Sequence, residues 1–272
     1  MHLHMIVLFS LLRFSISFTT SCSSSRILSF HPRAKFTRGC PYGAHPPSLL
    51  DEINAEIIQD LPIYSILDSI RESIVEKPNL LLEAAPGAGK TTIVPLLLSS
   101  LSSGSGADRD TSSRTNIIVV EPRRVATRSA AQRMAGLVNQ SLGDSVGYAI
   151  RGERKFSSKT QVTVMTDGVL LNKLRDDPEL DGVDIVILDE FHERGVGADT
   201  ALALLREVQL NYRSDLKLVV MSATLLGDVD SHGGLGEGSM GAKLLKALGG
   251  GDTCNILQSA GRQFPITLQH SK

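Results

Sequence analysis

A charged run, Asp189 to Arg194 (sequence DEFHER), follows directly on the apolar stretch 183–188. A short run rich in β-branched residues is typical of a buried parallel strand, whose C-terminal end presents ligand residues at the edge of an open α/β sheet. Asp189 is then placed to bind Mg²⁺, and Glu190 to orient, or take a proton from, water attacking a terminal phosphate. The pair Asp-Glu alone would also fit an ordinary strand with a charged loop, so an upstream partner motif decides between the two interpretations.

That partner is the run Ala84 to Thr91 (AAPGAGKT), which follows the apolar residues 80–82 and leads into a helical pattern from Thr92 to Leu101. Glycines let the backbone turn tightly, so that N–H groups and the start of the following helix face the β- and γ-phosphates. The Lys neutralises phosphate charge and the Thr hydroxyl completes the Mg²⁺ coordination. The general pattern begins with Gly where this chain has Ala84. The predicted ATP-binding residues are Pro86, Gly87, Ala88, Gly89, Lys90, Thr91 and Thr92, with Thr91 and Asp189 as Mg²⁺ ligands.

Three further segments occur in a fixed order: 121–126 (EPRRVA), 166–170 (TDGVL) and 222–224 (SAT). With the two motifs above, this order resembles the first RecA-like domain of superfamily 2 DEAH-box RNA helicases, and most closely the HrpB-type branch, where Phe replaces Ala in the DEAH run. Segments 147–151 (GYAIR) and 261–266 (GRQFPI) also match, so the resemblance covers about residues 60–272. It implies an α/β fold, a RecA-like P-loop NTPase domain with a mostly parallel sheet flanked by helices, and ATP and Mg²⁺ as cofactors.

A second group of residues is expected to contact RNA. Arg123 and Arg124 follow the strand-like run 117–120 and open a helix, where two cations oppose the helix dipole and favour an anionic partner. The hydroxyl and N–H groups after the strand-like run 161–165 suit sugar–phosphate contacts, or alternatively cap the next helix. With no Trp and few aromatic residues, backbone-directed binding with little sequence specificity is expected. The predicted RNA-binding residues are Arg123, Arg124, Arg151, Thr166, Asp167 and Gly168.

Four residues are assigned roles mainly by the resemblance. It implies that Ser222 and Thr224 couple the state of the bound nucleotide to the strength of RNA binding, although the same residues could also cap a helix. It also implies that His192, which has no second ligand at metal spacing, hydrogen-bonds across a domain cleft. Arg133 either stacks on adenine, as in related helicases, or belongs to a charged helix face. The predicted catalytic set is Lys90, Asp189, Glu190, His192, Ser222 and Thr224.

Charge and cysteine content divide the chain at about residue 50. Residues 1–50 hold five basic residues and no acidic one, which leaves 23 basic against 29 acidic residues, a balance of −6, in residues 51–272. Any RNA site must therefore be a local patch. The first segment resembles an organellar transit peptide, more plausibly plastid than mitochondrial; a secretory or two-part plastid signal, a wrongly assigned start and a cytoplasmic protein are the alternatives. Two of the three cysteines lie there, and neither a disulfide framework nor a membrane span is predicted.

Alternating apolar runs and helical patterns in residues 51–272 predict βαβ units in one ATP-binding domain. Helices are expected over 51–60 and 63–76, and flexible surface insertions near 99–114 and 227–241. A short helix near 242–248 and a last strand near 255–258 follow.

Nothing after residue 224 matches the arginine-bearing motif of the family's second RecA-like domain. The resemblance therefore implies an ATP-dependent RNA helicase domain that hydrolyses ATP weakly by itself and is completed by such a domain in a full-length protein. The competing interpretations are a non-catalytic, ATP-gated RNA-binding or assembly module and a truncated gene model.

Overall fold

The computed structural model describes residues 49–53, 55–101, 115–225 and 239–259. Within these residues one sheet of eight strands runs through the molecule in the order β4-β3-β5-β2-β6-β7-β1-β8. Every neighbouring pair is parallel except β3 with β4. The strands are β1 (Asn79–Ala84), β2 (Ile117–Glu121), β3 (Val146–Ile150), β4 (Glu153–Lys155), β5 (Val162–Thr166), β6 (Ile185–Leu188), β7 (Lys217–Ser222) and β8 (Cys254–Ser259).

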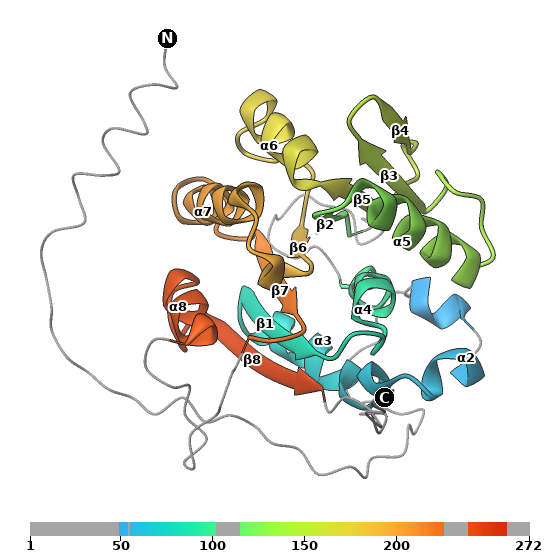
Figure 1. The fold of residues 1–272 in the computed structure, drawn as a ribbon, viewed down its shortest axis with the longest axis horizontal. Helices are drawn as coiled ribbons and strands as arrows, with labels where there is room; N and C mark the ends of the chain where they lie inside the picture. The colour runs from blue at the N-terminus through green and yellow to red at the C-terminus, as the bar shows by residue number, and fades with distance from the viewer. Residues whose placement is uncertain (1–48, 54, 102–114, 226–238, 260–272) are drawn as a thin grey trace, which may run out of the picture.

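Helices cover both faces of this sheet (Figure 1). On one face lie α3 (Leu67–Glu76), α4 (Lys90–Leu98) and α5 (Arg124–Leu137); on the other lie α6 (Asp167–Asp176), α7 (Val196–Asn211) and α8 (Met240–Ala247). Neighbouring strand residues alternate between the two apolar cores: Val119 and Ile187 join the first, Val120 and Leu188 the second. The central parallel strands are buried on both sides, as a parallel sheet requires, whereas the antiparallel β4 is exposed. This arrangement confirms the predicted α/β fold.

The N-terminal helices differ from the prediction. In place of two long helices over 51–60 and 63–76, the chain forms η1 (Leu49–Glu52), α2 (Ala55–Gln59) and η2 (Pro62–Ile66) before α3 begins at Leu67. Pro62 holds the preceding Leu61 in extended backbone (φ −79°, ψ 134°) and lacks a backbone donor, which ends helical hydrogen bonding there. The same proline then begins a tight turn in which the Tyr64 N–H donates to the Leu61 carbonyl at 2.9 Å.

The predicted surface segments are narrower than expected where the structure describes them. Leu49 and Leu50 are buried, and the Leu49 N–H donates to Ser99 Oγ at 3.0 Å, so the end of segment 1–50 belongs to the folded domain. Ser99 and Ser100 are also buried and do not belong to the predicted insertion 99–114. Gly241, the last residue of the predicted insertion 227–241, lies inside α8. Residues 1–48, 102–114, 226–238 and 260–272, with the predicted motif 261–266, lie outside the described residues.

Two further findings concern the described part of the chain. No helix in it has the length and apolar character needed to cross a membrane. Cys254 in β8 is buried, and burial raises the pKa of its thiol to about 12, so this cysteine is held as an unreactive thiol.

Candidate active site

The predicted site residues meet because five neighbouring strands are parallel. In β1, β7, β6, β2 and β5 the carboxyl ends lie at one edge of the sheet. At or directly after these ends lie the glycine-rich loop 85–89, Glu121, Thr166, Asp189 and Ser222, which come from five separate segments of the sequence. An edge of this kind is where open α/β sheets bind ligands. The structure therefore brings these predicted residues to the same edge of the sheet.

The loop after β1 has the backbone of a phosphate cradle. Gly87 and Gly89 have φ of 77° and 95°, in the left-handed region that favours glycine. A Cβ on Gly89 would lie 2.9 Å from Leu61 Cδ1, whereas one on Gly87 would meet nothing within 4 Å. Gly89 offers no side-chain cap to α4, so the helix presents its first N–H groups uncapped. Such a helix start attracts anions.

Two pairs of side chains join this loop to the end of β6. The Lys90 ammonium, only 4 % exposed, lies 2.7 Å from Glu190 Oε1. The Thr91 hydroxyl donates a short hydrogen bond to Asp189 Oδ2. Lys90, Thr91, Asp189 and Glu190 thus form one continuous group, in which a buried cation is balanced by carboxylates.

Glu121, at the end of β2, is a member of this group that sequence reasoning missed. Its side chain is buried beside Asp189, and burial, followed by the Asp189 carboxylate, raises the pKa of Glu121 to about 9. Burial also raises the pKa of Asp189, against the opposing effect of Lys90. The sequence did contain a signal for Glu121: like Asp189, it is a charged residue at the end of an apolar run. The raised pKa therefore favours the protonated form of Glu121 at neutral pH in the folded chain.

Replacing Glu121 with Gln, a neutral analogue of the protonated acid, is expected to reduce the loss of stability as pH rises. The Glu121 pKa lies above its ordinary value of 4.5. The contribution of Glu121 to the free energy of unfolding is therefore complete below about pH 4.5 and is lost as pH approaches 9. Thermal unfolding followed by circular dichroism from about pH 6 to about pH 9, in magnesium-free buffer, measures this. Glu207→Gln, at a surface position, is the control. Parallel curves for the parent and Glu121→Gln would show that Glu121 holds no proton.

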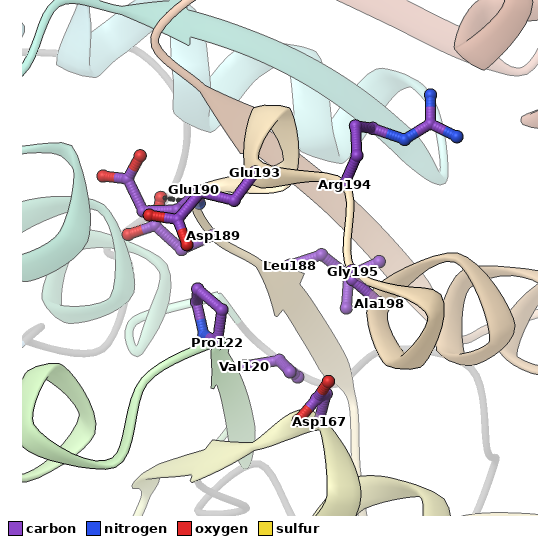
Figure 2. Close-up of a pocket in the computed structure, with 10 residues that line it drawn as sticks. All are labelled: Val120, Pro122, Asp167, Leu188, Asp189, Glu190, Glu193, Arg194, Gly195 and Ala198. Carbon is purple, nitrogen blue, oxygen red and sulfur yellow. Dashed lines mark hydrogen bonds between the residues drawn. The ribbon is translucent and has the colours of Figure 1, made fainter.

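The turn after Asp189 carries the expected water-activating carboxylate in strained backbone. Glu190 (φ 49°) and Arg194 (φ 52°) flank the short helix η3 (Phe191–Glu193), and Phe191 is buried beneath it. Figure 2 shows Asp189 and Glu190 side by side at the end of β6, while Arg194 extends in the opposite direction. The turn is therefore anchored by Phe191 and aims its carboxylates at the phosphate loop.

His192 joins this turn to the end of β7. Its Nδ1 lies 3.3 Å from Glu190 Oε2 and accepts from the Ala223 N–H at 3.5 Å. Ser222 is fully buried, and its hydroxyl accepts from the Thr224 N–H at 3.1 Å. These contacts connect the segment 222–224 with Glu190 inside this domain, whereas the sequence prediction for His192 concerned a contact across a domain cleft.

The residues predicted to bind RNA lie beside this group. Arg123 makes a two-pronged contact with Glu193, with Nη2 2.6 Å from Oε1 and Nε 3.3 Å from Oε2. Arg124 Nη2 donates to the Arg151 carbonyl at 3.1 Å. Both arginines are exposed. The pairing of Arg123 with Glu193 was not foreseen, because nothing in the sequence relates residues seventy positions apart.

The segment after β5 is partly occupied by contacts of its own. Thr166 is the N-cap of α6 by position but makes no side-chain cap bond. Asp167 Oδ1 accepts from the Gly168 N–H at 2.7 Å, so one N–H expected to face sugar–phosphate is already bonded. Of this segment, Asp167 lines a small pocket of about 10 Å³ that Glu193 and Gly195 also line, as drawn in Figure 2.

A larger hollow of about 370 Å³ opens beside the phosphate loop. Arg133 lines it together with Thr91, Glu121 and Glu190. This volume lies in the range of small-molecule sites. Arg133, whose predicted role was an adenine contact, therefore faces the same hollow as the residues of the phosphate site.

The family model for DEAD/DEAH box helicases matches residues 64–231. The chain belongs to this family. It is 45 % identical over 171 residues to the ATP-dependent RNA helicase HrpB of Escherichia coli (strain K12). The aligned region covers 63 % of this chain and 20 % of that helicase. It is 39 % identical over 175 residues to the DExH-box ATP-dependent RNA helicase DExH1 of Arabidopsis thaliana, covering 64 % of the chain and 17 % of the relative.

Solved structures give the same result. The crystal structure of the Escherichia coli DEAH/RHA helicase HrpB superimposes with a TM-score of 0.62 at 40 % identity, covering 76 % of this chain and 23 % of that one. A crystal structure of the E. coli DExH-box NTPase HrpB gives 0.61 at 41 % identity, covering 76 % and 22 %. The chain thus spans about a fifth of the length of these relatives. The helicase family and the RecA-like fold predicted from the sequence are confirmed.

The residues of this DEAD/DEAH box helicase domain fit ATP and Mg²⁺. The cradle offers uncapped helix N–H groups and the buried Lys90 for phosphate, and the open space at Gly87 leaves room for it. Thr91 Oγ1 and Asp189 supply the hard oxygen ligands that Mg²⁺ prefers. Among the described residues there is no group of three or more His, Cys, Asp or Glu side chains that could hold a metal ion.

Proposed function

We propose that this chain is the ATP-binding domain of an ATP-dependent RNA helicase, which binds ATP–Mg²⁺ and the RNA backbone and hydrolyses ATP. The observation that carries the proposal is the junction of the phosphate loop with the end of β6, where Lys90 contacts Glu190 and Thr91 contacts Asp189. Two helicase relatives whose names include ATP and RNA support it. An RNA-stimulated ATP turnover assay on a two-domain protein, described in the Discussion, tests it.

The protein's own groups suit hydrolysis at a terminal phosphate. The Lys90 ammonium and the α4 N–H groups bind phosphate oxygens, and Glu190 accepts a proton from the attacking water. Mg²⁺ held by Thr91 and Asp189 would neutralise phosphate charge. In this structure Glu190 neutralises Lys90. When phosphate binds, it replaces Glu190 as the partner of the Lys90 ammonium, and the Glu190 carboxylate is then released to act as a base.

RNA is proposed to lie over Arg123 and Arg124, beside the start of α5. Both guanidinium groups are exposed, and they sit at a helix N-terminus, which they disfavour in the absence of an anion. Arg123 shares its charge with Glu193, three residues after Glu190. A phosphate that binds Arg123 must displace Glu193, so RNA binding acts directly on the turn carrying Glu190.

Substituting both Arg123 and Arg124 with Ala is expected to weaken RNA binding about tenfold or more, and equally for unrelated sequences. The slope of log affinity against log salt should fall by about two, one for each lost phosphate contact. Fluorescence anisotropy with labelled single-stranded RNAs across a salt series measures both effects.

Two further variants control for charge. Arg175→Ala removes an exposed arginine of α6 that pairs with its neighbour Asp176, and should leave affinity unchanged. Glu193→Gln releases Arg123 and should strengthen binding. A marked preference for one sequence that survives the double substitution would point instead to a sequence-reading RNA module.

A further inference from the structure

A second cluster of charged side chains lies outside the nucleotide site, where α5 meets the β3–β4 hairpin. Both carboxylate oxygens of Glu153 are bonded in it: Oε2 to Arg128 Nη2 and Oε1 to the Tyr148 hydroxyl, each by a short hydrogen bond. The Arg128 guanidinium also lies over the Tyr148 ring, 5.9 Å from its centre. One carboxylate therefore binds a side chain from α5 and a side chain from β3.

This cluster lies next to Arg124 and Arg151, two of the residues predicted to bind RNA. Glu153 is the first residue of β4 and pairs with Ile150 of β3, so that Arg151 and Gly152 form the turn between them. Gly152 has φ 82°, which permits this tight turn. Arg124, one turn of α5 before Arg128, donates to the carbonyl of Arg151. The position of the Arg151 turn relative to Arg124 is thus fixed by contacts on both sides.

Apolar packing against α5 reaches strand β3 but not the turn of the hairpin. Every residue from 151 to 159 is exposed, so apolar packing does not hold the turn. Tyr148 is only 5 % exposed and belongs to the same apolar core as Ala130 and Met134 of α5. The Tyr148 hydroxyl is held in place by this core, and its hydrogen bond to Glu153 therefore fixes the exposed turn relative to the core.

We propose that Glu153 is a positioning residue for RNA: by joining Tyr148 and Arg128, it holds the Arg151 turn against Arg124 so that both arginines meet one RNA backbone. The inference rests on the proposed RNA binding. A carboxylate among Arg124, Arg128 and Arg151 repels phosphate, so its electrostatic effect alone opposes RNA. Hydrogen bonds from Tyr148 and Arg128 lower the pKa of Glu153, so the group remains charged at neutral pH.

Removing this carboxylate therefore separates two explanations by the sign of the effect. If Glu153 only adds negative charge to a basic surface, Glu153→Ala should strengthen RNA binding. If Glu153 positions the hairpin, the same substitution should weaken binding about threefold to tenfold and reduce the salt slope by about one, because the Arg151 contact is lost. Tyr148→Phe changes no charge and should weaken binding in the same direction.

The experiment measures the anisotropy of a labelled uridine homopolymer with the full chain, across a salt series. The variants are Glu153→Ala, Tyr148→Phe and Glu207→Gln; Glu207 is a partly exposed carboxylate on α7 that controls for net charge. Circular dichroism establishes that each variant is folded, and ATP affinity should be unchanged in all of them, because Glu153 and Tyr148 lie outside the nucleotide site.

A double-mutant cycle tests whether Glu153 acts through Arg151. In an Arg151→Ala background, Glu153→Ala should have little further effect on affinity, because the contact that it positions is already gone. Tighter or unchanged binding by Glu153→Ala, or additive effects in the cycle, would overturn the inference. Failure of the parent chain itself to bind the homopolymer would instead overturn the proposed RNA function on which the inference rests, and the parent measurement identifies that case.

Discussion

Replacement of Lys90 by Ala is expected to lower the affinity for ATP–Mg²⁺ at least about a hundredfold, a loss of about 2.7 kcal/mol. The ammonium is buried and lies 2.7 Å from Glu190, with Asp189 and Glu121 close by. Without it, phosphate would enter a site lined by the carboxyl groups of Glu121, Asp189 and Glu190. Isothermal titration calorimetry of the parent and the variant with ATP and Mg²⁺ gives the two dissociation constants.

A partly buried lysine provides the control for Lys90. Lys217 lies at the opposite, N-terminal end of the parallel strands, where its ammonium donates to the Ile74 carbonyl at 2.6 Å and burial lowers its pKa. Lys217→Ala removes a comparable partly buried cation and should leave ATP affinity unchanged, even if thermal stability falls. Equal ATP affinity for the parent and Lys90→Ala would show that the proposed phosphate site is wrong.

Features that depend on neighbouring residues could be predicted from the sequence. Short apolar runs, rich in β-branched side chains except for the leucines 80–82, predicted strands β1, β2, β5, β6 and β7, and the glycine spacing predicted the phosphate loop. Because parallel strands place their carboxyl ends at one edge, the meeting of Lys90, Thr91, Asp189 and Glu190 followed without knowledge of the tertiary contacts.

Contacts between distant residues could not be predicted in the same way. The pKa of Glu121 is raised by burial and by the Asp189 carboxylate, which follows another strand. Arg123 with Glu193, and Tyr148 with Glu153, are pairs whose partners are chosen by packing. The antiparallel strand β4 is short, charged and exposed, so its residues lack the alternation that marks a strand. Its one local signal was Gly152 at the turn.

The last expected result concerns the rate of hydrolysis and depends on Glu190. The carboxylate is held in strained backbone beside Lys90, so the chain has a base at the phosphate site. We expect slow ATP turnover from this chain alone. The arginines that family resemblance assigns to a second RecA-like domain stabilise charge on the transferred phosphoryl group, and groups of this kind raise rates about 10³–10⁵-fold. Adding that domain from a close relative should therefore give fast turnover that responds to RNA.

Glu190→Gln in the two-domain protein distinguishes hydrolysis from binding. The amide cannot take a proton from water, so turnover should fall about 10²–10⁴-fold. ATP should remain bound and bind somewhat more tightly, because the substitution also releases Lys90 from its 2.7 Å contact with the carboxylate. Phosphate release is measured for the single domain, the two-domain protein and its Glu190→Gln variant, each with and without RNA. The helicase proposal would fail if the two-domain protein were folded and ATP-loaded yet inactive. An ATP-gated RNA-binding role would then remain, because the nucleotide and RNA contacts do not depend on a base at position 190.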